Sequence, residues 1–221
     1  MHRQEDMGSW TRGLAAARVL GSELSALVGV VGSLPWRSLV HDTLAENGAH
    51  PVPVVLVHGF FGDPTNFTRL RRHLARHGIR RFASFAYAPR LDYPRLARAL
   101  HARIDAVRQV TGSRQVDVVA HSLGGLIARY LVQDGGALVV RRLVTLGTPY
   151  LAHANPPHEL AVFASDDPLV PPPADRMRRR MIVVHDCGHL GLLTHPRALA
   201  AVVRHLSAPP VVAGRIAGLA A

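Results

Sequence analysis

The sequence has no lysine, a single cysteine, Cys187, and few aromatic residues, which make up 5% of its 221 residues. One cysteine excludes an intrachain disulfide, so the fold does not depend on an oxidising compartment. Because aromatic side chains are scarce, Ala, Val and Leu must fill most of the interior. The hydrophobic fraction of 48% excludes a disordered chain. The length suits one well-buried domain.

Long uninterrupted apolar runs are also missing. Residues 13–36 are apolar overall, but Arg18 and Glu23 interrupt them. A membrane-spanning helix needs about 20 apolar residues, and a signal peptide needs a clean apolar core. We therefore expect residues 1–50 to form a helical extension that packs on the body or lies on a surface, with an uncleaved membrane-associated anchor as the alternative. A cytoplasmic or membrane-associated location is favoured, and secretion stays open.

Metal-ligand spacing is absent among the 14 histidines. No H-E-x-x-H pattern occurs, and His185 and His189 flank Gly188 in a predicted loop. We expect no metal ion and no other cofactor.

Positive charge is abundant: 26 arginines outnumber 15 acidic residues, for a net charge of +11. Such a charge favours anionic partners, either nucleic acid or a lipid surface. The arginines are spread along predicted helices, however, and no nucleic-acid-reading motif is present. We expect a solvated basic surface and no nucleic-acid partner. Contact with an anionic lipid interface remains an alternative.

From residue 51 onwards, short apolar runs alternate with longer amphipathic segments. This pattern predicts an α/β fold of about six mostly parallel strands flanked by helices. Residues 51–206 would form this domain, and residues 207–221 a C-terminal tail. The predicted strands are residues 52–58, 82–87, 115–121, 138–147, 159–165 and 180–186, and the predicted helices lie near residues 64–77, 92–111, 123–134 and 195–206.

Ser122 lies in the segment A-H-S-L-G, between a predicted buried strand and a predicted helix. A nucleophilic serine elbow needs this placement, because a sharp turn must expose the hydroxyl. Small residues are required two positions before and two after the serine, and Ala120 and Gly124 occupy them. Ala120 departs from the usual glycine without breaking the steric logic. The context indicates a nucleophile rather than an ordinary strand-to-helix turn.

A nucleophilic serine also needs a base, an orienting acid and donors for an oxyanion. In a fold with this elbow, the acid and then the histidine follow the serine in the chain. One predicted strand ends just before Asp166 and Asp167, and the next predicted strand ends just before His189. The backbone N–H groups of Leu123 and Phe60 are the candidate oxyanion donors.

Five segments together resemble the landmarks of bacterial serine lipases of the α/β-hydrolase superfamily, above all the small lid-less lipases of the Bacillus lipase A type. They are VLVHGFFGDPTNF, VVAHSLGGLIARY, LVTLGTPY, ASDDPLVPP and CGHLGLL, and the resemblance covers residues 52–206. It implies that Ser122 is the nucleophile and His189 the general base and acid. It also implies that Asp167 orients the imidazole, with Asp166 as the alternative.

Other residues of the same segments are open to two interpretations. Phe61, Tyr150 and Leu151 would line an acyl pocket or merely cover the sheet edge. His58 would be structural, and Asp63 would cap a helix. The short span between Gly147 and Asp167 leaves no room for a large lid.

The residues thus predict a serine hydrolase that cleaves carboxylic esters, either a triacylglycerol lipase or a carboxylesterase, through a Ser-Asp-His triad and an acyl-enzyme. A thioesterase or acyltransferase with the same triad is the main alternative, followed by a non-catalytic lipid-binding protein of this fold. The partner would be a small ester or lipid. The sequence does not fix the natural substrate, its chain length or the oligomeric state.

Overall fold

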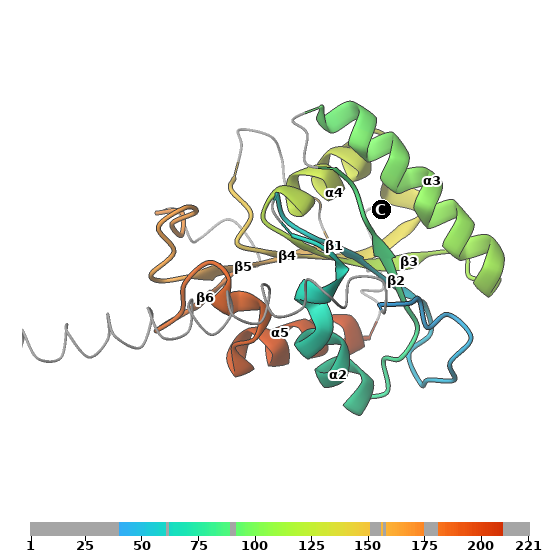
Figure 1. Cartoon of the computed structure of the whole chain (residues 1–221), viewed down its shortest axis with the longest axis horizontal. Helices are drawn as coiled ribbons and strands as arrows, with labels where there is room; N and C mark the ends of the chain where they lie inside the picture. Colours follow the sequence, from blue (N-terminus) through green and yellow to red (C-terminus); the bar gives the residue numbers. More distant parts are fainter. Residues whose placement is uncertain are drawn as a thin grey trace, which may run out of the picture.

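Six strands form one sheet in the order β2-β1-β3-β4-β5-β6, and every neighbouring pair is parallel (Figure 1). The computed structural model describes residues 40–60, 62–88, 92–150, 156, 158–174 and 181–209. The strands are β1 (Val54–Val57), β2 (Phe82–Phe85), β3 (Val116–His121), β4 (Val140–Leu146), β5 (Glu159–Ala164) and β6 (Met181–Val184). The predicted fold class is confirmed.

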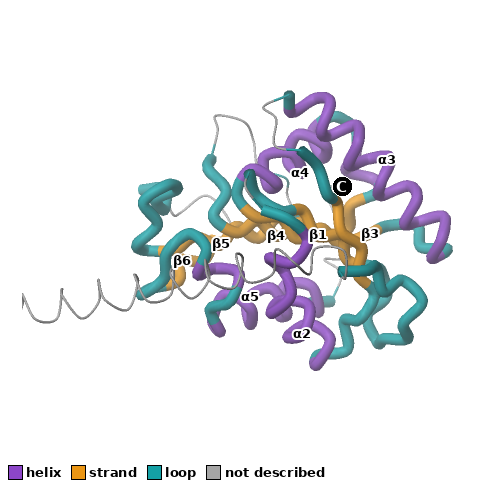
Figure 2. The backbone as a smooth tube through the Cα atoms, in the orientation of Figure 1, coloured by secondary structure: helices purple, strands orange, loops and turns teal. Residues whose placement is uncertain are grey.

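Helices cover both faces of the sheet, as Figures 1 and 2 show. They are α2 (Thr68–Arg76), α3 (Tyr93–Thr111), α4 (Leu123–Gln133) and α5 (Pro196–Ser207), with short 3₁₀ helices η2 (Pro64–Phe67), η3 (Gly136–Leu138) and η4 (Gly191–Leu193). Helices α3 and α4 pack on one face, and α2 and α5 on the other. All residues of β1, β3 and β5 are buried, which explains their continuous apolar runs.

All six strands are shorter than their predicted ranges, and for two of them the local reason is clear. Residues 136–138 form a 3₁₀ turn, so β4 begins only at Val140. Strand β6 ends at Val184. Asp186, two residues later, has a φ of 53°, and this left-handed backbone conformation is incompatible with a strand.

Asp42 and Thr43, in the segment before β1, lie along β2, one of the two edge strands of the sheet. The N–H of Thr43 donates to the Phe82 carbonyl at 2.8 Å, and its hydroxyl accepts from the Phe82 N–H at 3.2 Å. Asp42 accepts from the Ser84 N–H at 3.1 Å, and Arg103 donates to the Ser84 carbonyl at 3.1 Å. These contacts satisfy the backbone groups of Phe82 and Ser84, which point away from β1.

The helical extension was predicted at residues 1–50 and the tail at residues 207–221; of these, residues 1–39 and 210–221 lie outside the described residues. The described residues 40–50 contain no helix. None of the helices in the described ranges is long and apolar enough to cross a membrane.

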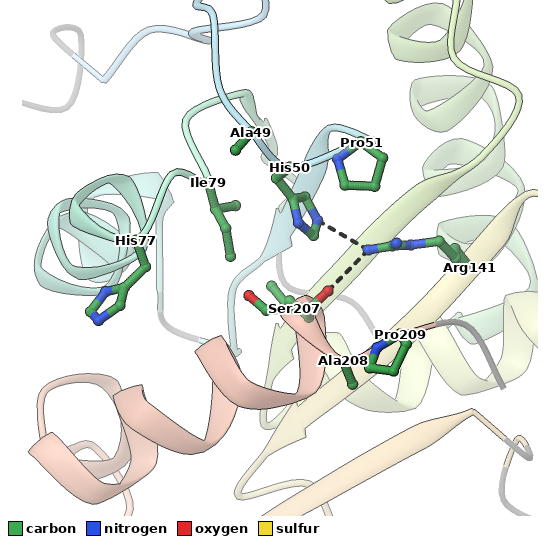
Figure 3. Close-up of a pocket in the computed structure, with 10 residues that line it drawn as sticks. Ala49, His50, Pro51, His77, Ile79, Arg141, Ser207, Ala208 and Pro209 are labelled. Atoms are coloured by element: carbon green, nitrogen blue, oxygen red, sulfur yellow. Dashed lines mark hydrogen bonds between the residues drawn. The ribbon is translucent and has the colours of Figure 1, made fainter.

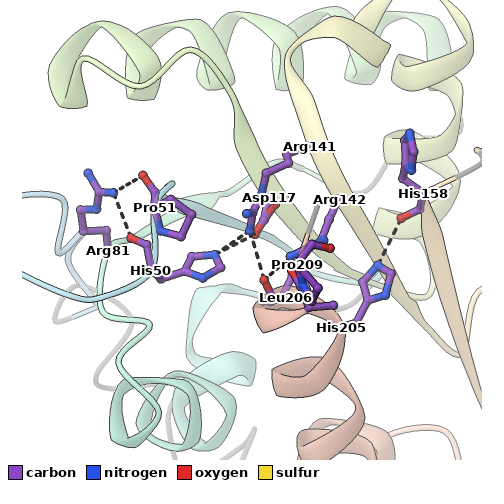
Figure 4. A network of polar contacts seen from close by, with 11 residues as sticks. His50, Pro51, Arg81, Asp117, Arg141, Arg142, His158, His205, Leu206 and Pro209 are labelled. Atoms are coloured by element: carbon purple, nitrogen blue, oxygen red, sulfur yellow. Dashed lines mark hydrogen bonds and ion pairs between the residues drawn. The ribbon is translucent and has the colours of Figure 1, made fainter. Parts of the chain in front are cut away.

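A buried charge cluster ties the two ends of the domain to the amino edge of the sheet (Figure 4). Asp117 of β3 is fully buried and accepts from His50 at 2.8 Å and from Nε of Arg141 at 2.9 Å. Arg141 also donates to the carbonyl of Leu206 at 3.2 Å, and Arg142 binds the same carbonyl. The segment before β1 and the end of α5 are therefore joined through β3 and β4.

Candidate active site

Ser122 lies on the turn between β3 and α4, with a φ of 51° and a ψ of −121°. Such values are rare for a residue with a Cβ, and they mark local strain. A Cβ on Gly124 would lie 2.5 Å from the carbonyl oxygens of Val57 and His58, so only glycine fits there. A Cβ on Gly59 would lie 3.1 Å from the Ser122 Cβ. The turn is thus pressed against the carboxyl end of β1.

Asp167 and His189 follow β5 and β6, respectively, and their side chains meet. The Nδ1–H of His189 donates to Oδ2 of Asp167 at 2.6 Å, and both side chains are buried. The other oxygen, Oδ1, accepts from the N–H groups of Leu169 and Val170 at 2.8 and 2.9 Å. Because Nδ1 carries the proton, Nε2 keeps its lone pair and can act as a base. Asp166 is exposed, and among the described contacts its carboxylate accepts a hydrogen bond only from the neighbouring hydroxyl of Ser165.

The loop after β4 lies between the serine turn and the histidine. Gly147 has a φ of 56°, and a Cβ there would lie 3.1 Å from Nδ1 and Cε1 of His189. The hydroxyl of Thr148 donates to the carbonyl of Ser122 at 3.1 Å. Ser122, Asp167 and His189 are therefore brought to one stretch of the carboxyl edge of the sheet, where parallel α/β sheets bind ligands.

His121, directly before Ser122 in the chain, packs against His189. Its ring centroid lies 4.7 Å from that of His189, and its Nε2–H donates to the His189 carbonyl at 3.3 Å. Burial lowers the pKa of His121 to about 3, which keeps the ring neutral. The sequence analysis did not identify this contact.

Of the two predicted oxyanion donors, Leu123 directly follows Ser122, and Phe60 belongs to the neighbouring turn after β1. Leu123 begins α4, and the first N–H groups of a helix have no partner within the helix. Phe60 follows Gly59 in the turn after β1, and this turn packs closely against Ser122 at Gly59. Asp63 fixes the end of this turn by capping η2, where it accepts from the Thr65 N–H at 2.7 Å, as expected.

His58 packs within the same loop, away from the His189 side. Its ring stacks on Tyr87 with centroids 4.3 Å apart, and its Nδ1–H donates to the Gly59 carbonyl at 2.8 Å. The Tyr87 hydroxyl donates to the His58 carbonyl at 2.7 Å, and burial raises the pKa of Tyr87, so this donor keeps its proton. The expected structural role of His58 fits these contacts.

A buried ion pair that the sequence analysis missed joins α4 to β5. Nη2 of Arg129 lies 2.7 Å from Oε1 of Glu159, and both side chains are almost completely buried. Arg129 also donates to the carbonyl of Pro149 at 2.7 Å, which fixes the loop after β4. The sequence feature that could have indicated this ion pair is a charged residue on the buried side of α4 and another on β5.

Of the three predicted pocket residues, Phe61 and Leu151 lie outside the described residues. Tyr150 is half-buried, with the guanidinium carbon of Arg129 4.7 Å from its ring centroid and the Phe163 ring centroid 5.3 Å away. Tyr150 therefore packs over the buried ion pair.

One hollow, of about 670 Å³, lies beside Phe60 at the carboxyl edge of the sheet. Another, of about 350 Å³, lies at the amino edge near Ser207 (Figure 3), and the side chains of His50 and Arg141 in its lining already bind Asp117. Within the described ranges, no group of three or more His, Cys, Asp or Glu residues could hold a metal ion.

Comparison with known proteins identifies relatives of this fold. The triacylglycerol lipase of Vibrio cholerae is 32% identical over 103 residues, which cover 43% of this chain and 33% of the lipase. The chain thus spans about a third of the length of this curated relative.

Solved structures are similar over most of the chain. A hydrolase from Thermoplasma acidophilum matches with a TM-score of 0.59 and 14% identity, covering 72% of this chain and 87% of that one. A lid-less serine hydrolase from Xanthomonas campestris matches with a TM-score of 0.55 and 17% identity, covering 73% and 81%. These two likenesses concern the fold alone. A family model for the alpha/beta hydrolase fold matches residues 52–171, more than half of the sequence. The chain therefore belongs to the α/β-hydrolase family.

Proposed function

We propose that this protein is a serine hydrolase that cleaves carboxylic esters. The observation that carries the proposal is the 2.6 Å contact between Asp167 and His189 at the sheet edge that also bears the strained Ser122 turn. The similarity to a triacylglycerol lipase supports acylglycerols or related esters as the substrate class.

In the proposed reaction, Nε2 of His189 takes the hydroxyl proton as Oγ of Ser122 attacks the ester carbonyl. The N–H groups of Leu123 and Phe60 bind the oxyanion of the tetrahedral intermediate. When the intermediate collapses, His189 returns the proton to the departing alcohol, leaving an acyl group on Ser122. Water, deprotonated by His189, then attacks this ester, and Ser122 regains its proton as the carboxylic acid leaves.

The contacts of Asp167 suit it to orient the imidazole. Its carboxylate holds Nδ1–H of His189 and is itself fixed by two backbone N–H groups. It thereby maintains the tautomer with a free Nε2 and stabilises the imidazolium that forms during the reaction.

The direct test is hydrolysis of p-nitrophenyl esters from acetate to palmitate. Ser122→Ala should lower kcat by about a millionfold, as in other units of this kind. Ser113→Ala, at the opposite edge of the sheet, serves as the matched control and should retain activity. A folded wild type without Ser122-dependent hydrolysis would overturn the proposal. Faster cleavage of a thioester than of the matching ester would replace it with the thioesterase alternative.

A further inference from the structure

His121 is the last residue of β3 and directly precedes Ser122, yet it is buried, with only 4% of its surface exposed. Its side chain contacts two segments that are distant in the sequence: the turn after β1 and the loop after β6. These segments carry the candidate oxyanion donor Phe60 and the proposed base His189, respectively. The proposed reaction assigns no step to the His121 imidazole.

Two contacts join His121 to the loop after β6. Its Nε2 lies 3.3 Å from the carbonyl oxygen of His189, and the centroids of the two rings are 4.7 Å apart. Because a carbonyl can only accept a hydrogen bond, Nε2 of His121 carries the proton. His121 therefore contacts both the main chain and the imidazole of the proposed base.

The opposite nitrogen of the same ring faces the turn after β1. A Cβ on Gly59 would lie 2.9 Å from Nδ1 of His121 and 3.1 Å from the Cβ of Ser122, so no side chain fits between the ring and this turn. Phe60 is the next residue of the turn. One imidazole thus packs against both the oxyanion turn and the base, and its size and hydrogen bond fix how these two parts lie relative to each other.

The ring is suited to this place because it stays neutral. Burial, together with the neighbouring His189, lowers the pKa of His121 to about 3. Of the other titratable groups that face the ring, Asp167 raises this pKa and His58 lowers it. A neutral ring does not oppose the positive charge that His189 acquires during the proposed reaction.

We propose that His121 is a positioning residue, which holds the base His189 in register with the oxyanion turn. This inference rests on the proposed function and adds a residue to its machinery. Because the imidazole is buried, it acts through His189 and not on the ester. A displacement of a reacting group by about 1 Å can lower the rate by about 100-fold, so loss of this support should reduce kcat and leave KM nearly unchanged.

Three variants test the proposal. His121→Leu keeps a similar volume but removes the donor, whereas His121→Gln keeps an N–H that can reach the same carbonyl. His50→Leu is the matched control, because His50 is also a buried histidine with a hydrogen bond through Nε2, but its partner Asp117 lies near the amino edge of the sheet. The values of kcat and KM for p-nitrophenyl butanoate are measured for the wild type and all three variants, at a temperature where circular dichroism shows each to be folded.

His121→Leu should lower kcat by about 10- to 100-fold and change KM by less than about twofold. His121→Gln should restore kcat to within about fivefold of the wild type, because the His189 carbonyl regains its donor. His50→Leu should lose stability but keep the wild-type kcat. A kcat for His121→Leu within about threefold of the wild type, no recovery in His121→Gln, or an equal loss in His50→Leu would each overturn the inference.

Proton NMR gives a second measurement that does not depend on turnover. The Nδ1–H of His189, which lies in a 2.6 Å hydrogen bond to Asp167, should give a far-downfield resonance. This resonance should be present in the wild type and His121→Gln and be broadened or lost in His121→Leu. An unchanged resonance in His121→Leu would refute the positioning role. Failure of the proposed function has a different signature, namely a folded wild type without Ser122-dependent hydrolysis.

Discussion

Asp166 and Asp167 are neighbours in the chain, yet only Asp167 contacts His189. We expect Asp167→Asn to lower kcat for ester hydrolysis by about 10⁴-fold, because an amide does not hold the imidazole in the required tautomer. Asp166→Asn is the matched control and should change kcat little. Comparable losses in the two variants, or a loss of less than tenfold in Asp167→Asn, would contradict the assignment.

Burial of His121 makes stability depend on pH. Its pKa falls from 6.5 to about 3 on folding, so the unfolded chain binds a proton that the folded protein rejects. The stabilisation is complete above pH 6.5 and declines as the pH falls towards 3, with a slope of up to about 1.4 kcal/mol per unit.

Chemical denaturation of the wild type and His121→Gln between pH 4 and 7 measures this slope. The variant should show a shallower decline below pH 6.5, because glutamine takes up no proton. Parallel curves would refute the link between His121 and acid sensitivity.

The sequence suggests site residues where the chemistry is local. Ser122 is proposed because small residues lie two positions before and two after it, and His189 because it follows a strand that ends on the same edge of the sheet. The choice between Asp166 and Asp167 depends on which side chain turns inward after β5, which the sequence pattern leaves open. The contact between the His121 and His189 rings joins residues far apart in the sequence, so no local pattern reveals it.

At the scale of the elements, the pair between Arg129 and Glu159 links the helix that begins after Ser122 to the strand that leads to Asp167. Glu159→Ala leaves a buried guanidinium without its carboxylate, and we expect a loss of about 3–5 kcal/mol in the free energy of unfolding. Replacing both residues with apolar ones, Arg129→Met with Glu159→Leu, should restore much of the loss. Urea denaturation measures both effects, and a loss below about 1 kcal/mol in the single variant would contradict the prediction.

Strands and helices were predictable because each follows from a short apolar run or from proline near a helix start. Pro94 and Pro196 do lie in the first turns of α3 and α5. Which segments are joined by buried polar and charged side chains was not predictable from the sequence. Asp117 meets His50 and Arg141 only because folding brings three distant segments together.

At the scale of the whole molecule, the net charge of +11 allows a test of contact with anionic membranes, the alternative to a merely solvated basic surface. If that alternative holds, binding should depend on lipid charge and on salt. Vesicles containing anionic lipid should sediment with the protein at low salt, and neutral vesicles should not. Raising the ionic strength to about 1 M shortens the screening length to about 3 Å and should release the protein. Exposed arginines on α2 provide a variant, Arg69→Glu with Arg72→Glu and Arg76→Glu, which should weaken binding. Binding that is equal for neutral and anionic vesicles would refute the electrostatic interpretation.

The contacts along β2 have a consequence for self-association. Thr43, Asp42 and Arg103 occupy the outward backbone groups of Phe82 and Ser84, which would otherwise offer a template to a strand of another molecule. A shortened chain beginning at residue 52 would retain Ser122, Asp167 and His189 but expose this template. We expect it to form aggregates that scatter light at concentrations where the longer chain stays clear. We therefore expect the segment before β1 to protect the edge of β2 from pairing with a strand of another molecule.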